Sequence, residues 1–421
     1  MCMEIWCVLC GGYIENVYRC FAMKCYFRSF DVGPGDCNVI RLADGDRQYS
    51  IMVDCGSYTK SVKAYVRDVL HNHINLLIAT HIDGDHIQGM TRMLNEHKGL
   101  TIGEIWYNAY RRDSDFAPVE LTEQQQSILQ DLQEQLLLEF DAINYREINA
   151  KQGRTLAESI LTNDSYKHIW KRKPITKDTA DYDIPGGWGR IVFLSPQPEA
   201  IETIDEKFKE TFDETFMREW NDSIAHGEEL QELLIRLVEQ MANGVDSQEI
   251  AASDEPRYDA SYVRKQANIE TTDSSETNGS SIAFMLECGA HKIAMLGDAF
   301  SNTIVSAIDA KYATEDKPLE CDAIKVSHHG SNGNNSRLLY EHINSHMFII
   351  PGGKGDKYPT FGTLGRIAET HKDGQIKHII FSYHSSQAEE MHAMDEEVKK
   401  DLGIETVIGE EEYELFEWQN D

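Results

Sequence analysis

Four side chains able to bind metal ions lie within six residues, directly after an apolar run. The stretch THIDGDHIQG holds His81, Asp83, Asp85 and His86 around a glycine. In an extended segment alternate side chains point to one side, so we expect His81, Asp83 and Asp85 to face the same way. His86 then follows as the chain turns into a helix. This spacing could give two metal ions a pair of ligands each; the alternative is a solvated loop with an Asp at a helix N-terminus.

Three further apolar runs end in the same residue types. Asp54 ends SIMVDCGS, Asp298 ends IAMLGDAF, and His328 and His329 follow the run in DAIKVSHHGS. Taken singly, these side chains could cap a turn or a helix, or lie on a surface loop. Because sheets of this kind bind ligands beyond the carboxyl ends of their strands, their joint occurrence predicts a site with two metal ions.

The elements that must position these residues are short strands alternating with helices. INLLIAT, for example, reads as a buried strand and SVKAYVRDVL as a helix, which together predict an α/β fold of mixed sheets covered by helices. Residues 24–421 form the expected domain, and amphipathic helical segments predict a helical insertion at about 197–275. Residues 1–23 read as an extension or a misassigned start, with Cys7 and Cys10 as an alternative small zinc site.

Bulk composition narrows the class of protein. The chain has 421 residues and a formal net charge of -31, which repels nucleic acid and anionic membranes at long range but leaves room for a local basic groove. No apolar run approaches the ~18 residues of a membrane-spanning helix, and the N-terminus does not read as a signal peptide. With nine cysteines suited to a reducing compartment, we expect a cytoplasmic protein.

The ordered motifs resemble those of the metallo-β-lactamase fold superfamily. The similarity is greatest to its ComEC-like branch, the soluble domain of a DNA-internalisation competence protein and its free-standing relatives. It is carried by FDVGPGD, IMVDCG, THIDGDHIQG, ETNGSSIAFMLECGAHKIAMLGD, HHGS and GGKGDKYPTFGTLGRI. This resemblance implies an αβ/βα sandwich, in which two mixed sheets are flanked by helices.

The same resemblance implies roles for the metal-binding residues. His81 and Asp83 would bind one ion, and Asp85, His86 and His328 the other. Asp298 would bridge the two ions, and Asp54 would orient a ligand from behind.

The resemblance also suggests the residues around the substrate. His329 would face the substrate or share a ligand role, and Asp83 or Asp85 could steer a water molecule. Lys354 and the loop 331–336 could hold a phosphate, although Lys354 reads equally well as a solvated turn residue.

Three departures from the family pattern bear on the metal. Asp83 stands where most of the superfamily has a second histidine, which favours Mn²⁺ while leaving Zn²⁺ possible. No histidine of the third motif is evident before the insertion. Tyr358 stands where the ComEC-like pattern usually has a histidine.

These features together predict a metal-dependent hydrolase. The first hypothesis is a phosphodiesterase or nuclease that uses a hydroxide bridging two divalent ions. The second is a hydrolase of a small molecule, such as a nucleotide, a cyclic nucleotide, a phosphorylcholine-type ester or a lactone, because the fold is shared by all of these. A third is a partner component of a multi-gene bacterial system of the defence type, with the helical insertion as the contact arm.

Overall fold

The computed structural model describes residues 23–108, 156–157, 159–171, 173–211, 258–352, 357–370 and 374–418. The predicted N-terminal extension, with Cys7 and Cys10, lies outside these residues except for Met23. Most of the predicted insertion and Lys354 also lie outside them, so the partner role of the insertion stays a prediction. Within the described residues, no helix combines the length and the apolar character needed to cross a membrane.

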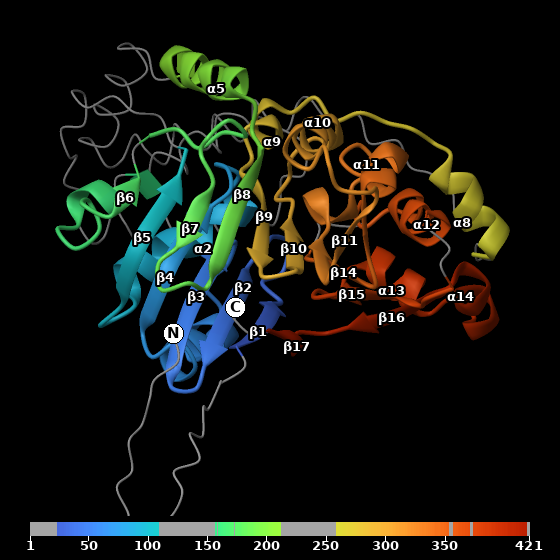
Figure 1. The fold of residues 1–421 in the computed structure, drawn as a ribbon, viewed down its shortest axis with the longest axis horizontal. Helices are drawn as coiled ribbons and strands as arrows, with labels where there is room; N and C mark the ends of the chain where they lie inside the picture. The colour runs from blue at the N-terminus through green and yellow to red at the C-terminus, as the bar shows by residue number, and fades with distance from the viewer. Residues whose placement is uncertain are drawn as a thin grey trace, which may run out of the picture.

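Two large mixed sheets form the centre of the molecule (Figure 1). The first has the order β17 (Glu412–Trp418), β1 (Met23–Ser29), β2 (Asn38–Asp44), β3 (Arg47–Val53), β4 (His73–Ala79), β5 (Thr101–Tyr107) and β6 (Trp170–Lys171). The second has the order β16 (Ile404–Ile408), β15 (Lys377–Phe381), β14 (Met347–Ile350), β12 (Ala323–Lys325), β10 (His291–Met295), β9 (Ala283–Cys288), β8 (Gly189–Ser195) and β7 (Tyr182–Ile184). A separate parallel pair is formed by β11 (Leu319–Cys321) and β13 (Ile343–Ser345).

Each large sheet is parallel on one side and antiparallel on the other. In the first sheet the strands from β3 to β6 are parallel, and in the second those from β10 through β12 to β16 are parallel. The antiparallel parts are hairpins, such as β2–β3, whose turn contains Gly45 at a φ of 56°. The predicted metal-binding residues and their neighbours Asp54 and His329 follow β3, β4, β10 and β12. Each of these strands belongs to the parallel part of its sheet.

Three apolar layers hold the sheets and helices together. One layer fills the space between the two sheets, where Phe27 and Ile78 of the first sheet belong to the same buried cluster as Phe284 and Met295 of the second. The second layer lies between the first sheet and the helices α1 (Lys60–Asp68) and α2 (Gly84–Glu96).

The third layer lies between the second sheet and the helices beside it in Figure 1. These are α8 (Ala260–Ala267), α10 (Ser301–Lys311), α11 (Arg337–His342), α12 (Phe361–Glu369), α13 (Ser386–His392) and α14 (Glu396–Leu402). The order helix, sheet, sheet, helix confirms the predicted fold class, an αβ/βα sandwich of two mixed sheets flanked by helices.

Two helices lie at the ends of the predicted insertion. Helix α5 (Pro198–Thr211) follows β8, and α8 precedes the segment that returns to β9. Helix α8 packs closely on α12, because a Cβ placed at Gly365 would lie 2.6 Å from the carbonyl oxygen of Val263. The chain that follows α8 is thereby held close to the loop after β12.

Arg366 of α12 fixes that arrangement. Its buried guanidinium donates to the carbonyl oxygens of Ala267 at the end of α8 and Ile269 just after it, and to those of Asn332 and Asn335 in the loop after β12. Four carbonyl acceptors satisfy a group that would otherwise be costly to bury.

Candidate metal centre

The HIDGDH stretch lies where β4 ends and α2 begins. Helix α2 starts at Gly84, with Asp83 as its N-cap residue. The extended alternation predicted from His81 to Asp85 therefore ends at Asp83, and Asp85 lies in the first helical turn. That part of the prediction was wrong, because the helix begins two residues earlier than the alternation required.

The loop is packed against neighbouring backbone at glycines. A Cβ placed at Gly35 or Gly56 would lie 2.2 or 2.1 Å from the carbonyl oxygen of Asp85. The Asp85 carbonyl also accepts a hydrogen bond from the amide of Asp36, at 3.0 Å. The two loops that follow β1 and β3 thus fix the start of α2 through backbone contacts that only glycine permits.

Four histidines turn one ring nitrogen toward a single carboxylate oxygen. The Nε2 atom lies 3.4 Å from Asp298 Oδ2 in His86 and 3.8 Å from it in His328. The corresponding distance is 3.9 Å for His81 and 4.0 Å for His329. The segments that follow β4 of the first sheet and β12 of the second therefore converge on Asp298, which follows β10.

The other ring nitrogens of these histidines face acceptors. His86 Nδ1 donates to Asp54 Oδ2 at 2.8 Å, and His81 Nδ1 donates to the hydroxyl of Thr80 at 3.0 Å. Thr80 in turn donates to Asp54 through both its amide and its hydroxyl, each at 2.8 Å. With the protons on Nδ1, the Nε2 lone pairs of His81 and His86 face inward, as in metal-binding histidines.

The His328–His329 pair is held in the same manner. His328 Nδ1 donates to Asn334 Oδ1 at 2.8 Å and lies 3.4 Å from Asp273 Oδ2. His329 Nδ1 lies 3.2 Å from Asp36 Oδ1. Each of the four histidines thus has a partner behind it.

Backbone strain is concentrated at these positions. Asp54, His328 and His329 have φ angles of 60°, 45° and 50°, in the left-handed region that residues other than glycine rarely adopt. Such conformations cost about 1–3 kcal/mol each and persist where the surrounding structure fixes them, often at functional sites. The strain at the two histidines aims neighbouring side chains at the same centre.

Electrostatics at the centre favour added positive charge. Burial and the neighbouring His86 lower the pKa of His81 to about 3. Burial alone would lower the pKa of His86 and of His328, but Asp298 and other carboxylates outweigh it. The pKa of His86 lies well above its ordinary value, and that of His328 rises to about 9. Burial alone would raise the pKa of Asp298, but His86 and His328 hold it well below its usual range. The carboxylates thus draw protons onto His86 and His328, and a divalent cation would replace those protons.

The distances between donor atoms fit metal ions better than hydrogen bonds. Two donors about 2.1 Å from one ion lie about 3–4.2 Å apart, depending on the angle between them. The separations from Asp298 Oδ2 to the four nitrogens, 3.4–4.0 Å, fall in that range and exceed a hydrogen bond. The buried Nε2 atoms of His81, His86 and His329 also lack a hydrogen-bond partner among the residues that the structure describes, which is costly unless an ion is bound.

Two buried groups of donors are close enough to hold an ion. One consists of His81, His86 and Asp298, and the other of Asp36, His86 and His329. Asp83 and Asp85 lie at the edges of these groups, because Asp83 Oδ2 is 3.8 Å from His81 Nε2 and Asp85 Oδ2 is 3.3 Å from His329 Nε2.

The structure brings together all the predicted metal-binding residues that it describes. The predicted set His81, Asp83, Asp85, His86, Asp298 and His328 lies around one centre, with Asp54 behind His86 and His329 beside Asp85. Lys354, for which a phosphate role was predicted, lies outside the described residues. The Tyr358 ring lies 5.0 Å from the His328 ring, measured between centroids.

Sequence reasoning missed three charged residues of the site. Asp36 stands in FDVGPGD and Lys325 in DAIKVSHHGS, so both were in motifs that the resemblance had marked. Asp273 stands in a polar stretch that reads as a loop, and contacts with Asn278 and Asn334 hold its carboxylate beside His328.

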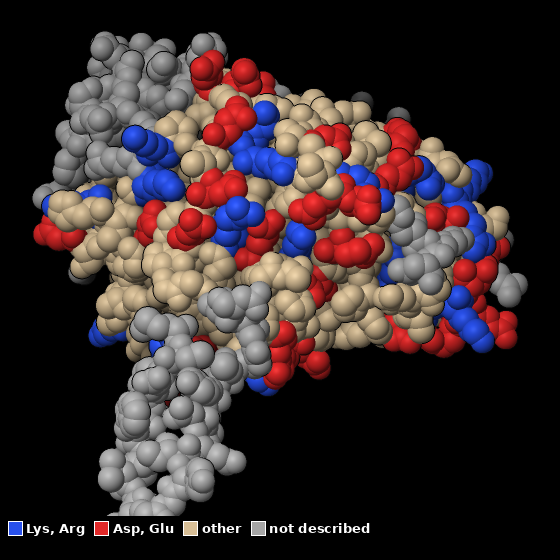
Figure 2. Space-filling view, in the orientation of Figure 1, with Lys and Arg blue, Asp and Glu red and all other residues tan. Residues whose placement is uncertain are grey.

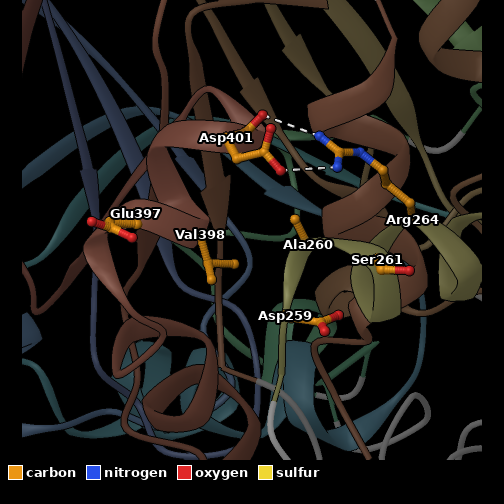
Figure 3. A pocket seen from close by; sticks show the side chains of 7 residues that line it. All are labelled: Asp259, Ala260, Ser261, Arg264, Glu397, Val398 and Asp401. Carbon is orange, nitrogen blue, oxygen red and sulfur yellow. Dashed lines mark hydrogen bonds and ion pairs between the residues drawn. The ribbon is translucent and has the colours of Figure 1, made fainter.

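A separate surface hollow of about 350 Å³ lies between α8 and α14 (Figure 3). These two helices lie at the right of Figure 1, away from β4 and α2 at the left. The Arg264 guanidinium extends across the hollow to the carboxylate of Asp401, at 2.9 Å, and to Glu369. Of the described residues that line it, the one cation, Arg264, is already paired with carboxylates and none is a histidine or cysteine, so the hollow offers no chemistry comparable to that of the histidine cluster.

No family model and no curated protein matches the chain. Among solved structures it is similar to the metallo-β-lactamase fold protein YhfI from Bacillus subtilis, with 10% identity, a TM-score of 0.34, and coverage of 93% of this chain and 99% of that one. It is similar to Zn²⁺-bound PqqB from Methylobacterium extorquens, with 9% identity, a TM-score of 0.36, and coverage of 93% and 100%. It is also similar to a diphosphatase from the PhnP family, with 8% identity, a TM-score of 0.35, and coverage of 94% and 100%. Likenesses at this level carry no argument about chemistry, so the candidate metal centre rests on its own side chains.

Proposed function

We propose that this chain is a metal-dependent hydrolase that cleaves phosphodiesters. The observation that carries the proposal is the set of four imidazole Nε2 atoms within 4.0 Å of Asp298 Oδ2. Each of these imidazoles has its other nitrogen directed at an acceptor. A set of buried histidines and carboxylates with inward lone pairs is suited to holding two divalent ions.

The proposed ligands fall into two sets that share Asp298. His81 and Asp83 would hold one ion, and His86, Asp85 and His329 the other. When bound, two divalent ions would lower the pKa of a water molecule and stabilise charge on the leaving oxygen. Either Mn²⁺ or Zn²⁺ suits this mixture of nitrogen and oxygen donors.

His328 is the histidine that we place beside the substrate. Its side chain is 15% exposed, whereas those of His81, His86 and His329 are 0% exposed. Asp273 and Asn334 fix its ring, so that its Nε2 could contact an oxygen of a bound diester. We therefore assign the ligand role to His329 and the substrate-facing role to His328, whereas the resemblance implied a ligand role for His328 and either role for His329.

The motif resemblance to ComEC-like domains is what favours a phosphodiester over a lactone. The surface favours a small diester over long duplex DNA. On the face in Figure 2, Lys and Arg side chains of the described residues are interspersed with Asp and Glu side chains rather than gathered in one stripe. Together with the net charge of -31, this arrangement gives a polyanion little long-range attraction.

The test is an assay with three substrate classes. Bis(p-nitrophenyl) phosphate, single-stranded DNA and a lactone are each incubated with the full chain and Mn²⁺ or Zn²⁺. We expect diester cleavage that is lost in Asp298→Ala and Asp85→Ala and retained in Asp322→Ala, a carboxylate paired with His291 elsewhere in the fold. Lactone turnover without diester cleavage would support the small-molecule alternative, and bound metal without any turnover would contradict the hydrolase proposal.

A further inference from the structure

Lys325 is a buried cation in the centre that the proposed mechanism does not use. It ends β12, two residues before the Ser327–Gly330 turn that carries His328 and His329. Its side chain is 1% exposed. Burying an ammonium group is costly unless it is paired and hydrogen-bonded, so its partners indicate its role.

Three acceptors surround the Lys325 ammonium. It forms an ion pair with Asp36, donates to the carbonyl oxygen of Gly297 at 2.9 Å, and lies 3.7 Å from Asp298 Oδ1. Asp36 follows β1 of the first sheet, whereas Lys325 belongs to the second. The ion pair therefore joins the two sheets directly beneath the histidine cluster.

Asp36 lies behind two of the proposed ligands. Its Oδ1 is 3.2 Å from His329 Nδ1, and its Oδ2 is 3.9 Å from His86 Nδ1. The Asp36 carboxylate, His86 and His329 are close enough to hold a cation themselves. The Lys325 ammonium is paired with Asp36 Oδ2, and Asp36 Oδ1 faces His329 Nδ1. We therefore treat Asp36 as a partner of the histidine rings and not as a ligand of an ion.

The charges of the site also require a cation at this position. Five carboxylates face the proposed ions or the histidines that would bind them: Asp36, Asp54, Asp83, Asp85 and Asp298. Two divalent ions would supply four positive charges, and Lys325 supplies the fifth. A buried site that is close to neutral avoids the large cost of uncompensated charge.

We propose that Lys325 is a positioning residue of the metal centre. It holds Asp36 against the Nδ1 atom of His329, so that the Nε2 atom of this ring faces the ions, and it balances the fifth carboxylate. This inference rests on the proposed function, because it assumes that the centre binds metal. Partners behind metal-binding histidines typically change metal affinity by about 10–100-fold, which sets the expected size of the effect.

The test compares two buried lysines. Lys325→Met removes the ammonium while keeping the length of the side chain. Lys377→Met is the matched control, because Lys377 is also buried and donates to the backbone carbonyls of Ile367 and Thr370, away from the site. The readouts are Co²⁺ affinity by competition with a chromophoric chelator and the visible absorption spectrum of bound Co²⁺, which reports the ligand geometry.

We expect Lys325→Met to bind at least one Co²⁺ ion about 10–100-fold more weakly, with an altered Co²⁺ spectrum. Lys325→Arg should partly restore both readouts, and Lys377→Met should leave both unchanged. Should Lys325→Met fail to fold, Asp36→Asn tests the same contact from its other side and should show the same loss. Wild-type affinity and spectrum in Lys325→Met, or in Asp36→Asn if it is needed, would overturn the inference. Absence of Co²⁺ binding by the wild type would instead overturn the proposed function.

Discussion

The hydrogen bonds of Asp54 make a prediction about metal affinity that does not depend on the substrate. Asp54 Oδ1 accepts from the Thr80 amide, and Oδ2 accepts from the Thr80 hydroxyl and from His86 Nδ1, all at 2.8 Å. In Asp54→Asn the amide oxygen must face the Thr80 amide, which can only donate. The new NH₂ group then faces His86, so Nδ1 must accept and the proton moves to Nε2, the atom proposed to bind metal.

The expected loss is about 10–100-fold in metal affinity, or about 1.4–2.8 kcal/mol of binding free energy. Folding should be retained, because asparagine has the same shape and tolerates the φ of 60° at this position better than alanine does. The measurement is Zn²⁺ or Mn²⁺ competition against a chromophoric chelator, with circular dichroism to confirm the fold.

A matched control exists in the same chain. Asp322 Oδ1 faces His291 Nδ1 at 2.9 Å, and its Oδ2 accepts from the Lys292 amide at 2.9 Å, outside the proposed centre. Asp322→Asn makes the same chemical change and should leave metal affinity unaltered. The reasoning about the His86 tautomer is refuted if Asp54→Asn binds metal as tightly as the wild type, or if Asp322→Asn loses as much affinity.

Three further predictions concern other residues of the centre. Asp298→Ala should lower kcat/KM for a diester by on the order of 100-fold or more, measured at saturating metal, because it removes the carboxylate that we propose both ions share. Gly56→Ala should destabilise the fold by about 1–3 kcal/mol in urea and weaken metal binding, since its Cβ would lie 2.1 Å from the Asp85 carbonyl oxygen. Burial alone would raise the pKa of Asp273, but hydrogen bonds from His328 and other groups lower it from 3.8 to about 2. The stabilisation is therefore present above about pH 4 and lost as the pH falls toward 2, and Asp273→Asn should flatten that part of a urea-unfolding profile.

Much of the fold could be predicted because local patterns and tertiary environment agree. The run INLLIAT became the buried parallel strand β4, and SVKAYVRDVL formed helix α1. The convergence of Asp298 with the His328–His329 pair could also be predicted, because the neighbouring parallel strands β10 and β12 bring their carboxyl ends to one edge. Asp54 follows β3 of the other sheet, so its place behind His86 depends on how the two sheets pack.

Other features of the site depend on packing that the sequence does not reveal. The sequence around Lys325 does not distinguish it from an exposed lysine at the end of a strand. Its burial depends on the loop of Asp36, which comes from the other sheet and packs against it. Asp273 lies in a loop, as its sequence context indicates. Its position beside His328 depends on contacts between segments that are far apart in the sequence. The helix start at Gly84 was missed because Asp83 fits an extended ligand pair and an N-cap residue equally well.

The central claim is that two metal ions lie on either side of the Asp298 carboxylate. Crystals of the full chain soaked with Zn²⁺ and measured at the zinc absorption edge test it directly. The account predicts two anomalous peaks that share Asp298, one bonded to His81 Nε2 and the other to the Nε2 atoms of His86 and His329. Zinc bound only elsewhere, or an empty centre at a concentration that saturates the protein in solution, would contradict it.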